Sequence, residues 1–333
     1  MKSSADVVFE LTKREWALLD AVAGAWTIRE AARRAGVPYT SARKIILEWK
    51  TRARMVFHLD FKAINLLPVF SFVSDLPTKT PPFTFSIRRV LGERPLYLLF
   101  SLVPTPFVDK FLKVLGRSLE LSVRGYVFLR WFPSSLGTKY NEEKEAVMYD
   151  IEGAIITGLS QGPAEEWEVK ETAPDKIDLA VIQGRMRDIF VRPGDAVDRA
   201  REEDPTVPAV SRQLLSYHVN RHVMPVWRGN SIHFFYESED SPLMLFLFEG
   251  EKAYSAAAAL VSMPGFYEAA IDTDKSLVIG QPPYRQLKAV DEIVEKFAVK
   301  LRGGTMMLDP KNLVEKEPRL WRYSENNKWV WVE

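Results

Sequence analysis

The chain has 333 residues, of which 47% are hydrophobic and 27% charged, and its formal net charge is +1. Because single cores usually span about 100–200 residues, this length predicts two or more domains. A net charge this small excludes a protein that binds nucleic acid through overall basicity. The chain has no cysteine, which excludes disulfides, thiolate metal sites and a cysteine nucleophile.

The amino-terminal sequence, MKSSADVVFELTKREW, lacks the apolar core of a signal peptide, and no apolar run approaches about 18 residues. We therefore expect a soluble, cytoplasmic protein that has no membrane partner. The absence of cysteine and the small number of Asn and Gln residues also fit a thermophilic source.

Residues 27–54 have the pattern of a helix-turn-helix. Thr27 and Glu30 have the spacing of a capping box, which predicts a helix start, and Gly36 with Pro38 ends that helix. In the next helix, apolar residues recur on one face, whereas hydroxyl and cationic side chains occupy the other. The segment holds eight Lys and Arg residues against two Asp and Glu residues. Such a helix has the features that major-groove recognition requires.

The flanking residues complete a winged helix-turn-helix domain over residues 1–62. A capping box of Thr12 and Glu15 predicts a preceding helix, and residues 55–61 alternate like a strand of a wing hairpin. Many units of this kind mediate only protein contacts, so DNA binding is one of two interpretations. For DNA binding, the predicted base and phosphate contacts are Tyr39, Thr40, Ser41, Arg43, Lys44, Lys50, Arg52 and Arg54.

Residues 63–140 predict an α+β domain, because strand-like apolar runs surround one helix that begins with proline and ends before Gly116. We predict strands at residues 66–75, 83–90, 95–103 and 119–132, a proline-rich loop at 76–82 and a helix at 106–115. Residues 141–174 then predict a linker, with a charged helix at 142–156 and an acidic stretch at 164–174. Residues 140–210 contain seventeen Asp and Glu residues against eight Lys and Arg residues.

Residues 175–238 predict a second winged helix-turn-helix, with helices at 177–190, 193–203 and 209–223 and a wing that runs from 226 to 237. Placing Val37-Pro38 over Val207-Pro208 aligns its last helix with that of the first unit. We expect the first unit to dominate DNA binding, because acidic helices surround the second. The predicted contacts in the second unit are Arg212, Gln213, Tyr217, Arg221 and, in the wing, Arg228.

Residues 239–333 carry the clearest fold signal. Their predicted order is β-α-β-β-α-β, which is the ferredoxin-like order, and the Trp-rich tail at 319–332 predicts a terminal hairpin or strand. The whole chain is therefore predicted to be an α+β tandem repeat, with two winged helix-turn-helix domains alternating with two ferredoxin-like sandwiches. The predicted elements of the last domain are strands at 243–248, 266–272, 276–280 and 305–308, and helices at 252–263 and 284–300.

This arrangement resembles the Lrp/AsnC family of transcription regulators, and within it archaeal members with two copies in one polypeptide. The resemblance implies that the ferredoxin-like domains serve effector binding and oligomerisation. It allows a small-molecule effector and a homodimer through those domains. The first sandwich departs from the family pattern, because the proline loop at 76–82 stands where its first helix should be, so we transfer no ligand residues.

Few residues point to catalysis. No phosphate loop, dinucleotide fingerprint or nucleophile elbow occurs, so we predict no enzyme, no catalytic residue and no cofactor. His218 and His222 stand four residues apart on one helix face and could suit a metal, but no third ligand is evident nearby. We predict no metal site there.

The sequence as a whole predicts a DNA-binding transcription regulator that reads duplex DNA. Two alternatives stay open. In one, the winged helices are scaffolding in a small-molecule sensor or a protein-interaction adaptor. In the other, strand aromatics such as Tyr126, Phe128 and Trp131 stack on the bases of single-stranded RNA, although such aromatics more often belong to a core.

Overall fold

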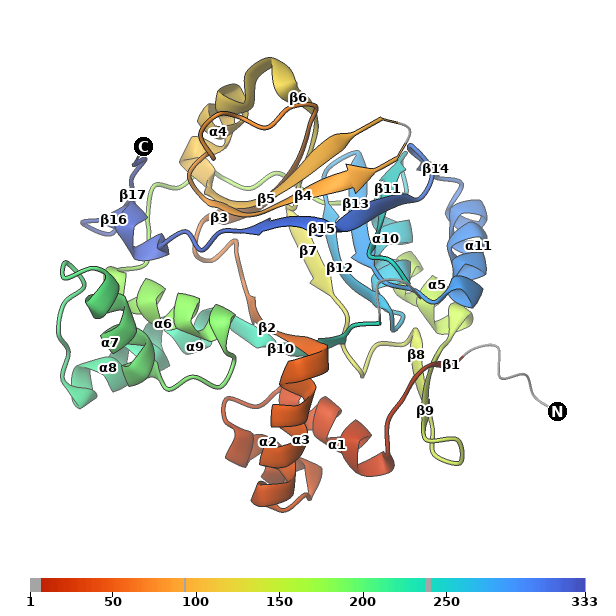
Figure 1. Ribbon diagram of the computed structural model, residues 1–333, viewed down its shortest axis with the longest axis horizontal. Helices are drawn as coiled ribbons and strands as arrows, with labels where there is room; N and C mark the ends of the chain where they lie inside the picture. The colour runs from red at the N-terminus through yellow and green to blue at the C-terminus, as the bar shows by residue number, and fades with distance from the viewer. Residues whose placement is uncertain (1–6, 93, 237–240, 333) are drawn as a thin grey trace.

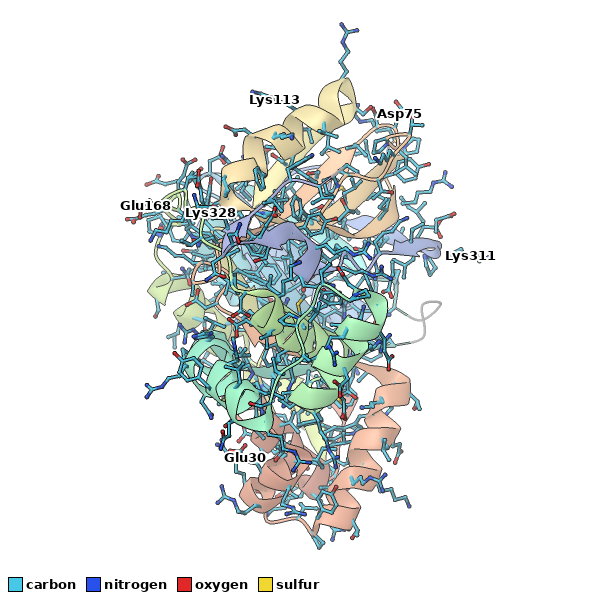
Figure 2. All side chains as sticks on the ribbon, turned by 90° about the vertical axis from the view of Figure 1, so that its left-hand side faces the viewer. Glu30, Asp75, Lys113, Glu168, Lys311 and Lys328 are labelled. Atoms are coloured by element: carbon cyan, nitrogen blue, oxygen red, sulfur yellow. The ribbon has the colours of Figure 1, made fainter. Side chains whose placement is uncertain are left out.

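The computed structural model describes residues 7–92, 94–236 and 241–332, and it is an α+β protein (Figure 1). A first helical unit (residues 13–52) and a second helical unit (residues 176–226) lie along one side of a large curved sheet, and further helices cover that sheet (Figure 1). Glu30 in the first unit and Lys113 lie at opposite ends of the molecule (Figure 2). Within the described ranges, the helices are too short or too polar to cross a membrane.

The first helical unit has the three predicted helices, α1 (Lys13–Ala23), α2 (Ile28–Ala35) and α3 (Tyr39–Arg52). Thr12 and Glu15 form the predicted capping box at α1. At α2 the Thr27 hydroxyl accepts a hydrogen bond from the Glu30 amide, but the Glu30 carboxylate accepts one from the Trp26 amide, one residue before the N-cap. The predicted apolar face of α3 is confirmed, because Ala42, Ile46 and Trp49 are fully buried.

The second helical unit repeats this order, with a longer connection before its last helical run (residues 204–211, against residues 36–38 in the first unit) and one added residue within that run. It contains α6 (Lys176–Arg187), α7 (Pro193–Glu203), α8 (Arg212–His218), a π-helical segment (Val219–Val223) and α9 (Met224–Val226). The helical run from residue 212 to residue 226, which follows the N-cap Ser211, is one residue longer than α3, which has 14 residues. A π-turn accommodates one extra residue in a helix. The N-caps Pro38 and Ser211 are equivalent, so the predicted alignment of Pro38 with Pro208 is wrong by three residues.

The wings differ from the prediction of one hairpin in each unit. Strand β2 (Ala53–Leu59) follows α3 and β10 (Trp227–Phe234) follows α9, and these two strands pair with each other antiparallel, with Val56 opposite Ser231. We call this pair the joining ribbon. It resembles the contact that two copies make around a two-fold axis, here within one chain. The predicted end of the second wing at residue 237, the boundary at 238–239 and residues 1–6 lie outside the described residues.

The large sheet has ten strands in the order β6-β3-β5-β4-β15-β11-β13-β12-β7, with β14 beside β11. Residues 76–82 contain no helix, as predicted. The elements of the first half are β3 (Leu66–Val73), β4 (Thr84–Leu91), β5 (Leu96–Pro104), α4 (Val108–Leu115) and β6 (Leu119–Arg124).

The second half follows the predicted β-α-β-β-α-β order. Its elements are β11 (Met244–Glu249), α10 (Ala253–Val261), β12 (Phe266–Ile271), β13 (Lys275–Gly280), α11 (Leu287–Phe297), β14 (Lys300–Leu301) and β15 (Met306–Glu315). In both halves the strands lie in the order fourth, first, third, second, where β14 and β15, which both pair with β11, count together as the fourth strand of the second half. β15 is longer than predicted because its second part pairs with β4, where Val314 lies opposite Ile87, and this pairing joins the two halves.

The predicted single strand at residues 119–132 is wrong, because it consists of β6 and β7 (Val127–Arg130). β6 pairs with β3 at one end of the large sheet, whereas β7 pairs with β12 at the other. Only Gly125 and Tyr126 separate them, so the two ends of the sheet meet and the sheet curls. A Cβ atom at Gly125 would lie 3.3 Å from Pro68 and 3.4 Å from Ala270, so a larger residue would require these neighbours to shift by a few tenths of an ångström.

The predicted helix at residues 142–156 is wrong for residues 142–150 and correct for residues 151–156. Strands β8 (Thr138–Asn141) and β9 (Ala146–Tyr149) form a hairpin beside β1 (Val7–Glu10), and α5 (Ile151–Ser160) follows. Ala146 and Val147 are buried in β9, whereas the charged residues before them, 142–145, are exposed in the turn of the hairpin. α5 packs against α10, where Gly158 meets the Ser255 carbonyl.

The acidic stretch and the tail complete the fold. The Trp167 indole donates a hydrogen bond to the Tyr126 carbonyl at 2.8 Å, and the Asn65 amide donates to Thr172, so the stretch is attached to the sheet. The predicted terminal hairpin is confirmed as β16 (Ser324–Glu325) with β17 (Lys328–Trp329). Both helical units share one hydrophobic core, which includes Trp49, Ile182 and the tail residue Trp321.

Candidate functional site

The outward face of α3 carries the polar residues predicted to contact DNA. Tyr39 is 46% exposed. Thr40, Arg43 and Lys44 are exposed, whereas Ser41 is half-buried. Among the residues that the structure describes, the side chains of Arg43 and Lys44 have no hydrogen-bond or ion-pair partner. Their charges are therefore available to an external anion.

Two of the cations near the end of α3 differ from Arg43 and Lys44, because they already pair with carboxylates. The Lys50 Nζ atom lies 2.7 Å from a carboxylate oxygen of Asp188, and Arg52 lies 3.4 Å from Glu15. Arg54 is exposed at the start of the joining ribbon. Lys50 and Arg52 already have acidic partners, so they offer less charge to a phosphate than the two cations in the middle of α3.

The second unit presents a similar face on α8 and the π-helical segment. Arg228, predicted to contact phosphate, instead lies 2.6 Å from Asp60 across the joining ribbon. Four predicted contact residues are exposed, and their side chains make no hydrogen bond or ion pair within the described part of the chain: Arg212, Gln213, Tyr217 and Arg221.

Buried polar contacts fix the two helical units to each other. Arg185 of α6 is 2% exposed, donates a hydrogen bond to the Trp26 carbonyl at 2.9 Å and stacks on the Trp26 ring at 3.8 Å. Burial lowers the pKa of Arg185 to about 10. The Asn230 amide of β10 donates hydrogen bonds to the carbonyls of Val22 and Ala25 at the end of α1. The two exposed faces therefore belong to one packed body.

The start of α6 brings two carboxylates to His218 and His222, so the prediction that no third ligand lies nearby is wrong. Asp178 Oδ1 lies 2.9 Å from His218 Nδ1, and Asp178 Oδ2 lies 2.9 Å from His222 Nδ1. Asp175 Oδ2 lies 3.3 Å from His218 Nδ1. Burial raises the pKa of Asp178, and the neighbouring Asp175 raises it further. We call these four residues the His–Asp cluster.

Helix capping places the two carboxylates. Asp175 is the N-cap of α6, and its Oδ1 atom accepts hydrogen bonds from the amides of Ile177 and Asp178, which leaves Oδ2 directed at His218. Asp178 occupies the third helical position, where Glu15 completes a capping box in α1. An Asp-x-x-Asp pair at a helix start followed by a His-x-x-x-His pair was the signal present in the sequence. Only the packing of α6 against α8 joins the two pairs.

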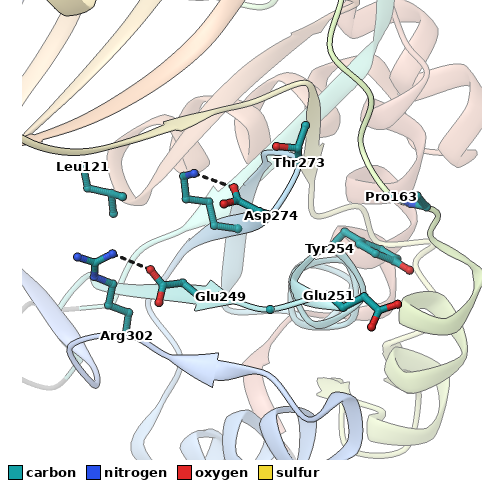
Figure 3. Close-up of a pocket in the computed structure, with 10 residues that line it drawn as sticks. Leu121, Pro163, Glu249, Glu251, Tyr254, Thr273, Asp274 and Arg302 are labelled. Carbon is teal, nitrogen blue, oxygen red and sulfur yellow. Dashed lines mark hydrogen bonds and ion pairs between the residues drawn. The ribbon is translucent and has the colours of Figure 1, made fainter.

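A hollow of about 690 Å³ lies at the loops after β11 and β12 (Figure 3). Arg302 lies 2.6 Å from Glu249, and Lys275 lies 2.7 Å from Asp274, so these charges are already paired (Figure 3). A second hollow of about 260 Å³ lies beside the joining ribbon, next to His58. We assign no ligand to either hollow.

The aromatics considered for RNA stacking are in packed positions. Trp131 is 2% exposed and donates a hydrogen bond to the Thr138 hydroxyl. Phe128 stacks with Phe100 inside the curled sheet, at 6.5 Å between ring centroids. Tyr126 is half-buried.

Comparison with family models, curated proteins and solved structures finds no match to this chain.

Proposed function

We propose that the protein is a sequence-specific, DNA-binding transcription regulator without catalytic activity. One observation carries the proposal. In each helical unit, the helix after the turn buries apolar residues in the shared core and exposes two cations whose side chains have no partner within the described residues: Arg43 and Lys44 in α3, Arg212 and Arg221 in the second unit.

The arrangement of the strands supports an Lrp/AsnC-like interpretation of the architecture. Each half of the large sheet has the fourth-first-third-second strand order of a ferredoxin-like unit, although the first half lacks one helix. The joining ribbon connects the two helical units as a dimer contact would, so one chain would supply two winged helix-turn-helix units. The partner is duplex DNA in the cytoplasm, and the ferredoxin-like halves are where an effector or a second chain would bind.

The proposal predicts that removing the two unpaired cations of α3 weakens DNA binding and reduces its salt dependence. Selection from a random pool of duplex DNA should yield a preferred sequence, and Arg43→Ala with Lys44→Ala should weaken its binding. Each phosphate contact that is lost should also lower the slope of log affinity against log salt concentration by about 0.9. Fluorescence anisotropy at several salt concentrations measures both quantities.

The matched control is Lys113→Ala with Arg117→Ala, which removes the same charge at or just beyond the end of α4. Lys113 lies at the opposite end of the molecule from Glu30 of the first helical unit (Figure 2). This variant should keep the affinity and slope of the original protein. Equal effects of the two double variants would contradict a role for α3. Failure to select any duplex sequence would favour the adaptor, and preferential competition by single-stranded RNA would favour the RNA-binding alternative.

A further inference from the structure

The His–Asp cluster brings four potential metal ligands together from two helices. One donor atom from each of Asp175, Asp178, His218 and His222 can be chosen so that all four lie within 4.8 Å of one another. In two of these residues the polar group is deeply buried, since the side chain of Asp178 is 5% exposed and that of His218 is 8% exposed. Burying a carboxylate is costly unless a cation or hydrogen bonds compensate it.

The spacing of these atoms suits a small divalent cation. A tetrahedral ion with bonds of about 2.0–2.1 Å has ligand atoms about 3.3 Å apart. Asp175 Oδ2 lies at this spacing, 3.3 Å, from His218 Nδ1. The two contacts of Asp178 are shorter, at 2.9 Å, and come from different oxygens, Oδ1 to His218 and Oδ2 to His222. All three contacts use Nδ1, so both rings direct the same nitrogen at the carboxylates, and a neutral imidazole can offer that lone pair while Nε2 keeps the proton.

We propose that Asp175, Asp178, His218 and His222 bind one divalent transition-metal ion. Two imidazoles and two carboxylates match the preferences of Zn²⁺ and its neighbours, whereas Ca²⁺ and Mg²⁺ prefer oxygen ligands alone. The His222 side chain is 39% exposed, which gives the ion a path from solvent. The π-helical segment supports the assignment, because it adds one residue to this helix and places His222 beside Asp178, and such turns occur often at functional sites.

Metal titration of the full chain tests the proposal in the absence of DNA, so its result is independent of the proposed function. After chelator treatment and buffer exchange, calorimetry with Zn²⁺ should give one bound ion per chain. Co²⁺ should give the visible absorption of a four- or five-coordinate site with nitrogen ligands. Bound metal should also raise the melting temperature of the chain, because it binds the folded state.

Two ligand variants keep the test informative if one of them folds poorly. Asp178→Asn keeps the side-chain shape, and His222→Gln changes a half-exposed position. Each should weaken Zn²⁺ binding by more than about 100-fold, because loss of a residue that only supports a ligand already costs about 10–100-fold. The control Asp195→Asn removes an exposed carboxylate of α7 and should leave binding unchanged.

The competing explanation is a hydrogen-bonded cluster, in which each Nδ1–H donates to Asp178 and no ion binds. Calorimetry without a one-to-one Zn²⁺ event would establish that explanation and overturn the proposal. Zn²⁺ binding that survives both ligand variants would overturn it as well, because the ion would then be bound elsewhere.

Discussion

Two histidines of the joining ribbon are buried in an environment that disfavours their charged form. His58 is 7% exposed and His233 is 4% exposed. Burial, followed by the nearby Arg130, lowers the pKa of each well below 6.5. Both imidazoles are therefore neutral in the folded protein at neutral pH, whereas in the unfolded chain they would accept protons near pH 6.5.

Acidification should destabilise the protein through these two groups. Below about pH 6.5 the unfolded state binds more protons than the folded state, so the free energy of unfolding rises with pH there and falls as pH falls. Each histidine contributes up to about 1.4 kcal/mol per pH unit to the slope of the free energy of unfolding against pH. Urea unfolding at pH 5, 6, 7 and 8 measures this slope.

The variant His58→Phe should reduce the pH dependence. The ring already packs on Phe132 at 4.7 Å, and its Nε2 atom is buried without a hydrogen-bond partner in the described structure, so phenylalanine removes a proton site without removing a bond. The loss of stability from pH 7 to pH 5 should become smaller, while the variant and the original protein keep the same slope between pH 7 and pH 8. An unchanged acid dependence would contradict the role of His58.

Residues 141–174 are predicted to be a linker, but α5 within them is part of the helical layer on the large sheet (Figure 1). A Cβ atom added to Gly158 would lie 2.6 Å from the Ser255 carbonyl oxygen of α10 and 2.6 Å from the Phe297 ring of α11. The small residue thus allows α5 to approach α10 closely.

Gly158→Ala should therefore lower the free energy of unfolding by about 1–3 kcal/mol, as overpacking usually does. Gly162→Ala is the matched control, because a Cβ atom there has nothing within 4 Å, and it should leave stability unchanged or raise it by up to about 1 kcal/mol. Denaturant unfolding of the two variants gives the comparison. A Gly158→Ala variant as stable as its control would mean that α5 does not pack as described.

The molecule as a whole holds its two helical units in one fixed arrangement. Arg185 on Trp26, Lys50 with Asp188 and the strands of the joining ribbon all connect the units directly. If both units bind DNA, as we propose, the separation of their half-sites must therefore be set by packing instead of by a linker.

A rigid arrangement predicts a strict spacing requirement in the bound DNA. Inserting about five base pairs between the half-sites, roughly half of a 10–10.5 bp turn, should place the second half-site on the wrong side of the duplex and reduce affinity. Arg212→Ala with Arg221→Ala should weaken binding to the original site but have little effect on the altered one. Equal affinity for the two spacings, measured by gel retardation, would indicate that only one unit binds.

The elements that could be predicted from sequence are those that local interactions specify. The capping box at Thr12, the end of α2 at Gly36 and the buried stripe of α3 each depend on residues within about four positions of one another. The same holds for the strand and helix order of residues 244–315, which alternation and helical periodicity indicate without knowledge of the partner strands.

What the sequence determined by itself was therefore most helices, most strands and the exposed cations of α3. Only the tertiary structure decided that β2 pairs with β10, that β6 and β7 separate at Gly125, and that Asp178 meets two histidines forty or more residues away. The physical reason is that strand pairing and side-chain clusters join residues distant in the chain. Alternation or spacing in one segment does not specify which distant segment will complete it.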